Sequence, residues 1–218
     1  MQRTISAMVG KGSVNHNSRK FRAENVDGTR THLNIDYCNE NIKTVYHELF
    51  DEALERYNAK QIRSDRKIKD YYEKIRSSKQ EKPFHEIILQ VGGKGNMNAD
   101  TENGELAKQI LDEYYQGFQE RNPQLRVFSA HLHMDEATPH LHIDFVPFTT
   151  GSKRGLDTRV SLKQALATQG FKGGSCGDTE WSQWVQSEKE QLAAVMERYG
   201  IEWEHKGTHE KHLSVLDY

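Results

Sequence analysis

Apolar side chains recur at helical spacing in several parts of the chain. This spacing predicts a helix over Ile42–Lys60, an amphipathic helix over Asn103–Arg121 and a long helix over Thr179–Tyr199. A strongly basic helix is predicted over Arg66–Ser77, and a short helix over Leu162–Gln169. Much of the chain is therefore expected to be helical.

Shorter β-prone stretches predict the strands. In one of them Phe128, Ala130 and Leu132 alternate with other residues, so these three side chains are expected to share the face that helices cover. Only six residues (MDEATP) separate the last two strands, and a parallel crossover needs about a dozen or more, so these two strands form an antiparallel hairpin. The order of elements predicts an α+β fold, with a mostly antiparallel sheet and helices on one face. The predicted strands are Thr4–Val9, Thr31–Tyr37, Phe84–Val91, Leu125–His133 and His140–Phe148.

Composition places the chain among soluble globular proteins. Its 218 residues suffice for one large domain or two small ones, and its three Trp, nine Tyr and eight Phe exclude a disordered chain. No apolar run approaches the ~18 residues of a membrane span, and the first residues lack a signal-peptide core. Two cysteines are too few for a disulfide framework or a cysteine-rich metal site. We therefore expect a cytoplasmic protein without a membrane segment.

The charges are unevenly distributed. The formal net charge is -2, but residues 1–82 hold 17 Lys and Arg against 12 Asp and Glu, whereas residues 83–218 hold 13 against 20. The densest basic segment, residues 56–82, has ten basic and four acidic side chains. This asymmetry suggests one side that faces a polyanion, although a solvated charged helix explains such a run more often.

Histidines cluster around the predicted hairpin. On the second strand His140, His142 and Asp144 share one face, and the hairpin brings His133 of the first strand beside them. Successive residues on one face are about 6.6 Å apart, so neighbouring imidazoles can share one metal ion and leave positions open for water and substrate. His131 is expected to have a supporting or structural role. Asp144 either orients a ligating histidine or is exposed.

Three motifs resemble those of a known family. HMDEATPHLHIDFVP, residues 133–147, is similar to the histidine-rich third motif of the MobV-type plasmid mobilisation relaxases, the Pre/Mob plasmid recombination enzymes of the HUH endonuclease superfamily. HNSR at residues 16–19 resembles the family's HNxR motif, and RTHLN at residues 30–34 resembles its R-S/T-H-L-N motif. The three occur in the family's order.

The resemblance implies a fold and an activity. The fold is the HUH palm, an antiparallel sheet with flanking helices, here as a single relaxase domain over residues 1–218 with a basic helical insertion near residues 42–82. The activity is site-specific, metal-dependent nicking and joining of DNA at an origin of transfer. It proceeds through a covalent histidine–DNA 5′-phosphoramidate and initiates plasmid or mobile-element mobilisation.

The resemblance also assigns roles to residues. His16 is the nucleophile, in place of the tyrosine of most HUH enzymes, and Glu136 is its orienting group or base. Arg19 and Asn17 position the nucleophile and the scissile phosphate. The metal ligands are His133, His140 and His142.

The expected cofactor and partners follow. Three imidazoles suit several divalent ions, and the family's usage favours Mn²⁺, with Mg²⁺ or another divalent ion as alternatives. The expected DNA partner is the single strand around the nick and an adjacent hairpin, with Tyr71 or Tyr72 available to stack bases. The family's long C-terminal helical region, which follows the relaxase domain, predicts a homodimer formed outside these residues. The expected DNA contacts are Lys20, Arg30, Lys67, Lys69, Lys153 and Arg154.

Three other functions stay open at this point. The first is a rolling-circle replication initiator with a tyrosine nucleophile, for which Tyr71, Tyr72 or Tyr37 are the candidates. The second is a non-catalytic DNA-binding protein on the same fold. The third is a metallohydrolase of small phosphodiesters, which would leave no covalent DNA adduct.

Overall fold

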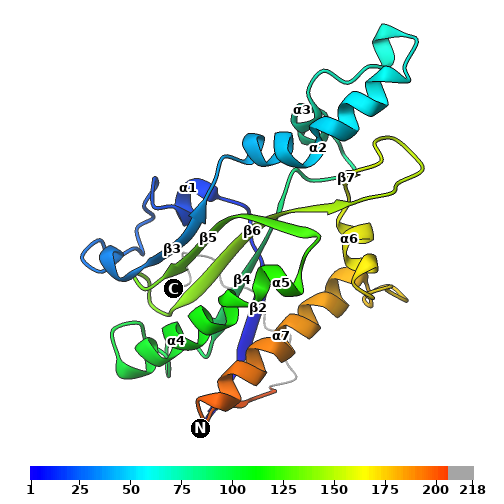
Figure 1. Cartoon of the computed structure of the whole chain (residues 1–218). Coiled ribbons are helices and arrows are strands. Elements are labelled where there is room, and N and C mark those ends of the chain that lie inside the picture. Colours follow the sequence, from blue (N-terminus) through cyan, green and yellow to red (C-terminus); the bar gives the residue numbers. More distant parts are fainter. Residues whose placement is uncertain (206–218) are drawn as a thin grey trace.

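A six-stranded antiparallel sheet lies at the centre of the computed structural model, which describes residues 1–205 (Figure 1). Each strand on the main path is antiparallel to its neighbours, and β7 (Arg159–Val160) pairs with the end of the longest strand. The expected α+β fold and the hairpin between the two histidine-bearing strands are confirmed. In spatial order the main strands are β2 (Ile5–Val9), β4 (His85–Val91), β6 (His140–Thr149), β5 (Leu125–His133) and β3 (Ile35–Asn39).

Helices cover one face of this sheet and bury its apolar side chains. Leu89, Ile143 and Phe145 of the strands lie in one cluster with Trp184 and Met196 of the longest helix. Because side chains alternate along a strand, the intervening residues, including the histidines, point to the opposite face. The covering helices are α4 (Glu102–Gln116), α5 (Phe118–Arg121), α6 (Leu162–Thr168) and α7 (Glu180–Arg198).

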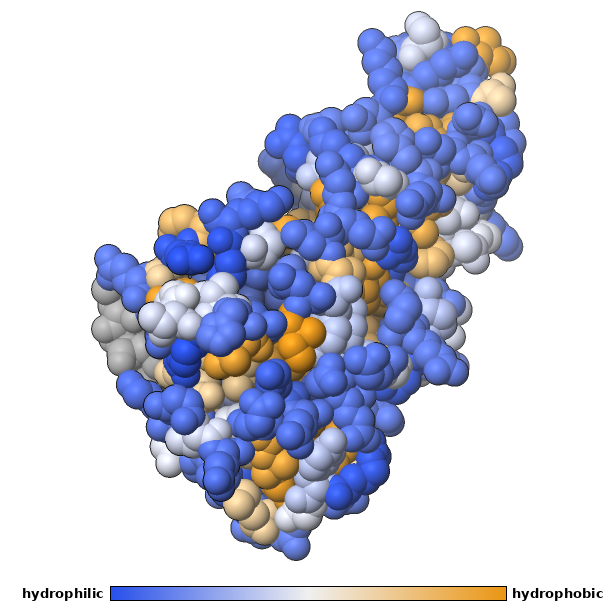
Figure 2. Space-filling model, turned by 60° about the vertical axis from the view of Figure 1, so that its left-hand side comes forward, coloured by the Kyte–Doolittle hydropathy of each residue, from blue (hydrophilic) through white to orange (hydrophobic). Residues whose placement is uncertain are grey.

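Residues 42–76 form an arm that projects from one end of the sheet (Figure 1). The arm contains α2 (Ile42–Ala59), a 3₁₀ turn at Ser64–Arg66 and α3 (Tyr71–Arg76). It has its own apolar cluster, which includes Phe50 and Tyr71 and contacts the sheet through Phe128 and Val146. Its outer surface is mostly hydrophilic (Figure 2).

Phe128 does not lie where simple alternation predicts. The pairing of β5 with β6 shifts register between Val127 and Ser129, and this bulge reverses the alternation along β5. Val127, Ala130 and Leu132 therefore belong to the main core, whereas Phe128 belongs to the arm's cluster. The bulge thus supplies the anchor that joins the arm to the sheet.

The predicted basic helix over Arg66–Ser77 is wrong in its first part, because α3 begins only at Tyr71. The side chain of Asp70 accepts a hydrogen bond from the Glu73 N–H at 2.9 Å and caps the helix there. The side-chain amide of Asn58 donates to the Ile68 carbonyl at 2.8 Å and accepts from the Ile68 N–H at 2.9 Å. These two bonds keep the residues before α3 extended.

Other boundaries also differ from the sequence expectation. The predicted strand over Thr31–Tyr37 begins as a 3₁₀ turn at Thr31–Leu33 and becomes β3 only at Ile35. The predicted helix over Asn103–Arg121 is two helices that meet at Gly117. Periodicity also missed the shortest elements: α1 (Val14–Asn17), β7 and the parallel pair β1 (Gln2–Arg3) and β8 (Glu202–Trp203).

Within residues 1–205, no helix is both long enough and apolar enough to span a bilayer. The polar tail KGTHEKHLSVLDY, residues 206–218, lies outside the described residues.

His85 is a titratable side chain on the helix-covered face, and its burial makes the stability of the fold depend on pH. Its ring stacks on Phe145 at 6.3 Å and lies 6.1 Å from Trp181 of α7. Burial, with the charge of Lys82, lowers the pKa of His85 from 6.5 to about 4. The unfolded chain therefore binds a proton that the folded chain excludes, so this contribution to stability is complete above pH 6.5 and is lost as the pH falls toward about 4.

We expect His85→Gln to remove this part of the pH dependence. The free energy of unfolding of the wild type, relative to that of His85→Gln, should fall by up to about 3 kcal/mol between neutral pH and pH 4. Urea unfolding of both proteins at several pH values measures it. Parallel stability curves would contradict the assignment.

Candidate active site

Three histidines meet on the open face of the β5–β6 hairpin. His133 of β5 lies directly opposite His140 of β6, and His142 follows on the same face of β6. The ring of His133 lies 5.2 Å from that of His140 and 4.7 Å from that of His142, and the latter two are 4.9 Å apart. The sequence-predicted triad is thus brought together by strand pairing alone.

Each of these rings has one nitrogen bound to a protein oxygen. Nε2 of His133 lies 2.8 Å from the Asn17 carbonyl, Nδ1 of His140 lies 2.8 Å from the Thr138 carbonyl, and Nδ1 of His142 lies 2.6 Å from Oε1 of Glu86. A carbonyl or ionised carboxylate accepts a hydrogen bond, so these nitrogens carry the protons and the other three have free lone pairs. Oxygen partners of this kind usually hold metal-binding histidines in position.

The ligand atoms near these rings form two overlapping groups that could hold a metal ion, namely His133, His140 and Glu136, and His16, His133 and His142. Nδ1 of His133 and Nε2 of His140 are 3.4 Å apart, and each lies within 3.9 Å of Oε1 of Glu136. Nε2 of His142 is buried and has no hydrogen-bond partner among residues 1–205, although an unpaired buried nitrogen is costly. Burial and the neighbouring imidazoles lower the pKa of His133, and burial lowers that of His142 to about 4. Both rings are therefore neutral, as metal ligation requires.

Glu86, which the sequence reading did not single out, is the orienting carboxylate of the triad. It lies on β4, is 3% exposed and accepts hydrogen bonds from His142, from the Asn17 amide at 2.8 Å and from the Gly12 N–H at 2.7 Å. Burial alone would raise the pKa of Glu86, but the contact with His142 holds it below the usual range. Its pairing partner on β6 is Asp144, so two carboxyl groups lie side by side.

Asp144 has neither of the two roles expected for it. It is fully buried, and Oδ2 accepts hydrogen bonds from the Asn17 amide at 3.0 Å and from the Ser129 hydroxyl at 2.9 Å. Burial, together with the nearby charge of Glu86, raises the pKa of Asp144 to about 7. Asp144 thus fixes the side chain of Asn17, which points into the protein rather than toward solvent.

The four-residue helix α1 places His16 over the triad. The His16 ring lies 6.0 Å from that of His133 and 6.1 Å from that of His142, edge to face in both pairs. Ligand atoms of His16, His133 and His142 all lie within 4.8 Å of one another, so His16 is close enough to react on a group bound at the triad or to be a ligand itself. Nε2 of His16 lies 3.5 Å from Oε1 of Glu136.

Arg19 ties α1 to the hairpin turn. Its backbone has φ 55°, a conformation that side-chain-bearing residues rarely adopt, and this turn at the end of α1 directs the guanidinium back toward His16. The guanidinium donates to Asp135 and to Glu136, and Nη1 lies 3.3 Å from Nε2 of His16. Burial would raise the pKa of Glu136, but its contacts with His16, His140 and Arg19 hold it well below the usual range. Glu136 is therefore ionised.

Asp135 connects all three sequence motifs. It is fully buried and accepts hydrogen bonds from Arg19 and, at 2.8 Å, from the Asn34 amide, while Oδ1 of Asn34 accepts from the Met134 N–H. Arg30 donates to the Glu136 carbonyl at 3.0 Å and to Asp27 at 3.1 Å, so its guanidinium is engaged within the protein. In the sequence, only their positions inside the motifs could have marked Asp135 and Asn34 as residues of the site.

Two further histidines have supporting positions. His131, on the same face as the triad, is buried beside His133, and its Nδ1 lies 2.5 Å from Oδ1 of Asp36. His32 is exposed, and its Nδ1 lies 2.9 Å from the Thr29 carbonyl.

The candidate tyrosines are engaged elsewhere. Tyr37 donates to Asp112 of α4 at 2.7 Å, and Tyr71 accepts from the Val160 N–H within the arm's cluster. Tyr72 packs edge-on against Tyr46. Each hydroxyl or ring therefore has a structural partner away from the histidines.

The expected basic DNA contacts lie in two places. Lys20 is exposed next to the site, whereas Lys67 and Lys69 are exposed on the arm. The loop with Lys153 and Arg154 follows β6, and a bidentate Arg56–Asp157 pair at 2.9 Å joins it to α2. Since His140 begins β6 and Thr149 ends it, about 30 Å separates the histidines from this second basic region.

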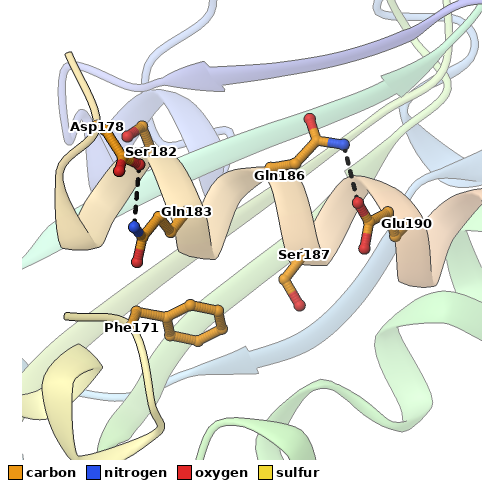
Figure 3. A pocket seen from close by; sticks show the side chains of 7 residues that line it. All are labelled: Phe171, Asp178, Ser182, Gln183, Gln186, Ser187 and Glu190. Atoms are coloured by element: carbon orange, nitrogen blue, oxygen red, sulfur yellow. Dashed lines mark hydrogen bonds between the residues drawn. The ribbon is translucent and has the colours of Figure 1, made fainter. Parts of the chain in front are cut away.

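A separate groove lies along α7, on the helix-covered side of the sheet. Its lining is mostly polar, with hydrogen bonds from Gln183 to Asp178 and from Gln186 to Glu190 (Figure 3). No residue of the histidine cluster lines it.

Comparisons with known proteins show the family and the fold of this chain. A family model described as a plasmid recombination enzyme (Mob_Pre) matches residues 12–218. The plasmid recombination enzymes type 3 of Staphylococcus aureus and Mammaliicoccus lentus are 28% identical to this chain over 157 residues, which are 70% of this chain and 33% of each relative. The chain thus spans about a third of the length of these curated relatives.

Two solved structures show the same fold. Both are Mn-bound crystal structures of the MobM relaxase domain (MOBV; Mob_Pre) bound to plasmid pMV158 oriT DNA. They match with TM-scores of 0.56 and 0.57 at 20% sequence identity, over 98% of this chain and 97% of theirs.

The substitution Gly10→Ala tests whether Glu86 holds the histidine triad in position. A Cβ at this position would overlap the Glu86 carboxylate, which is buried and cannot move aside freely. Gly10→Ala should expel that carboxylate and leave His142 and one of the two Asn17 amide hydrogens without an acceptor, at a cost of about 1–3 kcal/mol for each buried donor. Chemical unfolding measures the loss. Gly93→Ala is the matched control, because nothing lies within 4 Å of its Cβ, and equal stability of the two variants would contradict the role of Glu86.

Proposed function

The chain belongs to the family of plasmid recombination enzymes, and we propose that it is a relaxase domain that nicks and rejoins one DNA strand at an origin of transfer. The reaction is metal-dependent and passes through a covalent bond between His16 and the 5′ end of the DNA. The observation that carries this proposal is the cluster of three histidine rings, with centroids 4.7–5.2 Å apart, and the ring of His16 about 6 Å from two of them. Such a domain initiates plasmid mobilisation and acts in the cytoplasm, where plasmid DNA is found.

The metal site is the triad of His133, His140 and His142. Their unprotonated nitrogens form an all-nitrogen donor set, and the unpaired Nε2 of His142 fits a ligand atom better than an isolated buried one. A divalent ion bound there neutralises charge on the non-bridging oxygens of the scissile phosphate. Mn²⁺ is our choice, with Mg²⁺ or another divalent ion as the alternative.

His16 is the nucleophile in this proposal. Its unprotonated imidazole nitrogen attacks phosphorus, the N–P bond forms, and the P–O3′ bond breaks, so the 3′ oxygen leaves and takes up a proton. The phosphorylated ring is positively charged, and the ionised Glu136 at 3.5 Å stabilises that charge. Because the pKa of Glu136 is held so low, we assign it an electrostatic and orienting role rather than that of a base. A returning 3′ hydroxyl reverses the steps and rejoins the strand.

Arg19 and Asn17 have different tasks in this mechanism. The Arg19 guanidinium adjoins His16 and adds positive charge where the phosphate would lie. Asn17 is 2% exposed, so it positions α1 and the ring of His133 instead of touching the DNA.

DNA would contact the domain at two places. Lys20 and Arg30 border the nick site, with Arg30 contributing through its contact with the Glu136 carbonyl. Lys153 and Arg154, which follow the far end of β6, and Lys67 and Lys69 on the arm suit the phosphates of a hairpin beside the nick. The homodimer implied by the resemblance concerns residues beyond this chain and remains a prediction.

The decisive experiment is a search for the covalent product. Single-stranded oligonucleotides tiled across the DNA that flanks the gene are incubated with the protein and Mn²⁺, or with EDTA, and the products are analysed by mass spectrometry. We expect an acid-labile nucleotide adduct on His16 with Mn²⁺ and none with EDTA. His16→Ala should lose the adduct completely, whereas His32→Ala, which changes an exposed histidine of a neighbouring motif, should retain it.

Other results would favour the other functions. An adduct on a tyrosine would overturn the proposed nucleophile and favour a replication initiator. Free cleaved ends without an adduct would indicate a phosphodiesterase. Intact DNA that nevertheless binds would indicate a non-catalytic binding protein.

The arm supplies a separate test. Lys67→Glu with Lys69→Glu should weaken binding of an oligonucleotide with a hairpin about tenfold and flatten its salt dependence, because phosphate contacts are lost. Binding of a short unstructured strand should hardly change. Lys172→Glu with Lys189→Glu makes the same charge change on the α7 side. If both double variants weakened hairpin binding equally, only net charge would matter and the arm would not be a contact surface.

A further inference from the structure

Phe21 is an aromatic side chain that the fold leaves in solvent. It is 61% exposed, and among the large hydrophobic residues exposed between residues 1 and 205 it is the only aromatic one. It belongs to neither of the two apolar clusters. An exposed phenyl ring forgoes about 2 kcal/mol of burial free energy and is available to pack against a ligand.

The backbone holds Phe21 beside the nucleophile. The left-handed turn at Arg19 reverses the chain after α1, and the Phe21 N–H donates to the Asn15 carbonyl at 2.9 Å. Asn15 immediately precedes His16. Since Asp135 and Glu136 anchor Arg19, the position of Phe21 is fixed relative to the site even though its ring is free.

Cationic residues precede and follow Phe21 in the sequence. Lys20 and Arg22 are exposed, and neither has an ion-pair partner in the part of the chain described by the structure. Proteins that hold single-stranded nucleic acid combine such cations, which meet phosphates, with aromatic rings on which bases stack. A docking site for an apolar protein segment would not need both cations beside a single ring.

We propose that Phe21 is a base-stacking residue that holds a nucleotide next to the scissile phosphate in place for attack by His16. This inference rests on the proposed function and adds the substrate contact that the histidine cluster lacks. A stacked base fixes the sugar–phosphate backbone beside it, so the phosphate stays within reach of the nucleophile. Stacking is tolerant of sequence, because every base has a π-face.

Three variants separate stacking from other roles. Phe21→Trp keeps an aromatic face, Phe21→Leu keeps apolar volume without one, and Phe21→Ala removes both. With an oligonucleotide that the wild type nicks, we expect the Leu and Ala variants to raise KM roughly tenfold and the Trp variant to remain near wild type. The melting temperature should be unchanged in all three, because the ring packs against no core.

An abasic scan of the same oligonucleotide locates the partner base. Removing the stacked base should weaken binding by the wild type roughly tenfold and have no further effect on Phe21→Ala. Removing a distant base should affect both proteins equally. Equal KM values for all variants, or effects that simply add at every abasic position, would overturn the proposal.

Failure of this inference is distinguishable from failure of the proposed function. If the wild type forms the His16 adduct but the Phe21 variants behave identically, the relaxase activity stands and the stacking role falls. If the wild type itself forms no adduct on any oligonucleotide, the proposed function falls and the stacking role falls with it.

Discussion

The buried charge pair between Asp135 and Arg19 is the interaction on which the site depends. Removing two charges from water costs several kcal/mol per ion, and that cost is offset only when every remaining donor and acceptor is also satisfied. Here Arg19 also donates to Glu136, and Asp135 also accepts from Asn34, so the hydrogen-bonding groups of the pair have further partners. The pair holds Arg19 in an unfavourable backbone conformation, and that turn aims both its guanidinium and the preceding His16 at the hairpin.

A second constraint is that the two acidic groups behind the triad are both ionised only above about pH 7. Glu86 and Asp144 are paired across β4 and β6, and both contact the amide of Asn17. Two like charges so close in a buried environment drive one group toward its neutral form, and Asp144 takes that form more readily, since its pKa is raised to about 7. The single remaining charge resides on Glu86, where it orients His142.

The parts of this site that are local in sequence could be predicted, and the parts that depend on distant contacts could not. The six-residue connection fixes the β5–β6 hairpin and the period of two aligns His140 with His142, so the triad follows from the chain itself. Glu86 lies more than fifty residues from His142, in a strand whose pattern is otherwise apolar, and nothing local marks it. The bulge that moves Phe128 into the arm's cluster is likewise set by packing, not by periodicity.

The separate apolar cluster of the arm has an evolutionary consequence. Because the arm's core meets the sheet mainly through Phe128 and Val146, at the end of β6 remote from His140, its outer surface can diverge without strain on the histidines. If the domain is a relaxase as proposed, the arm is a module whose surface can be exchanged between relatives while the histidine site is inherited intact.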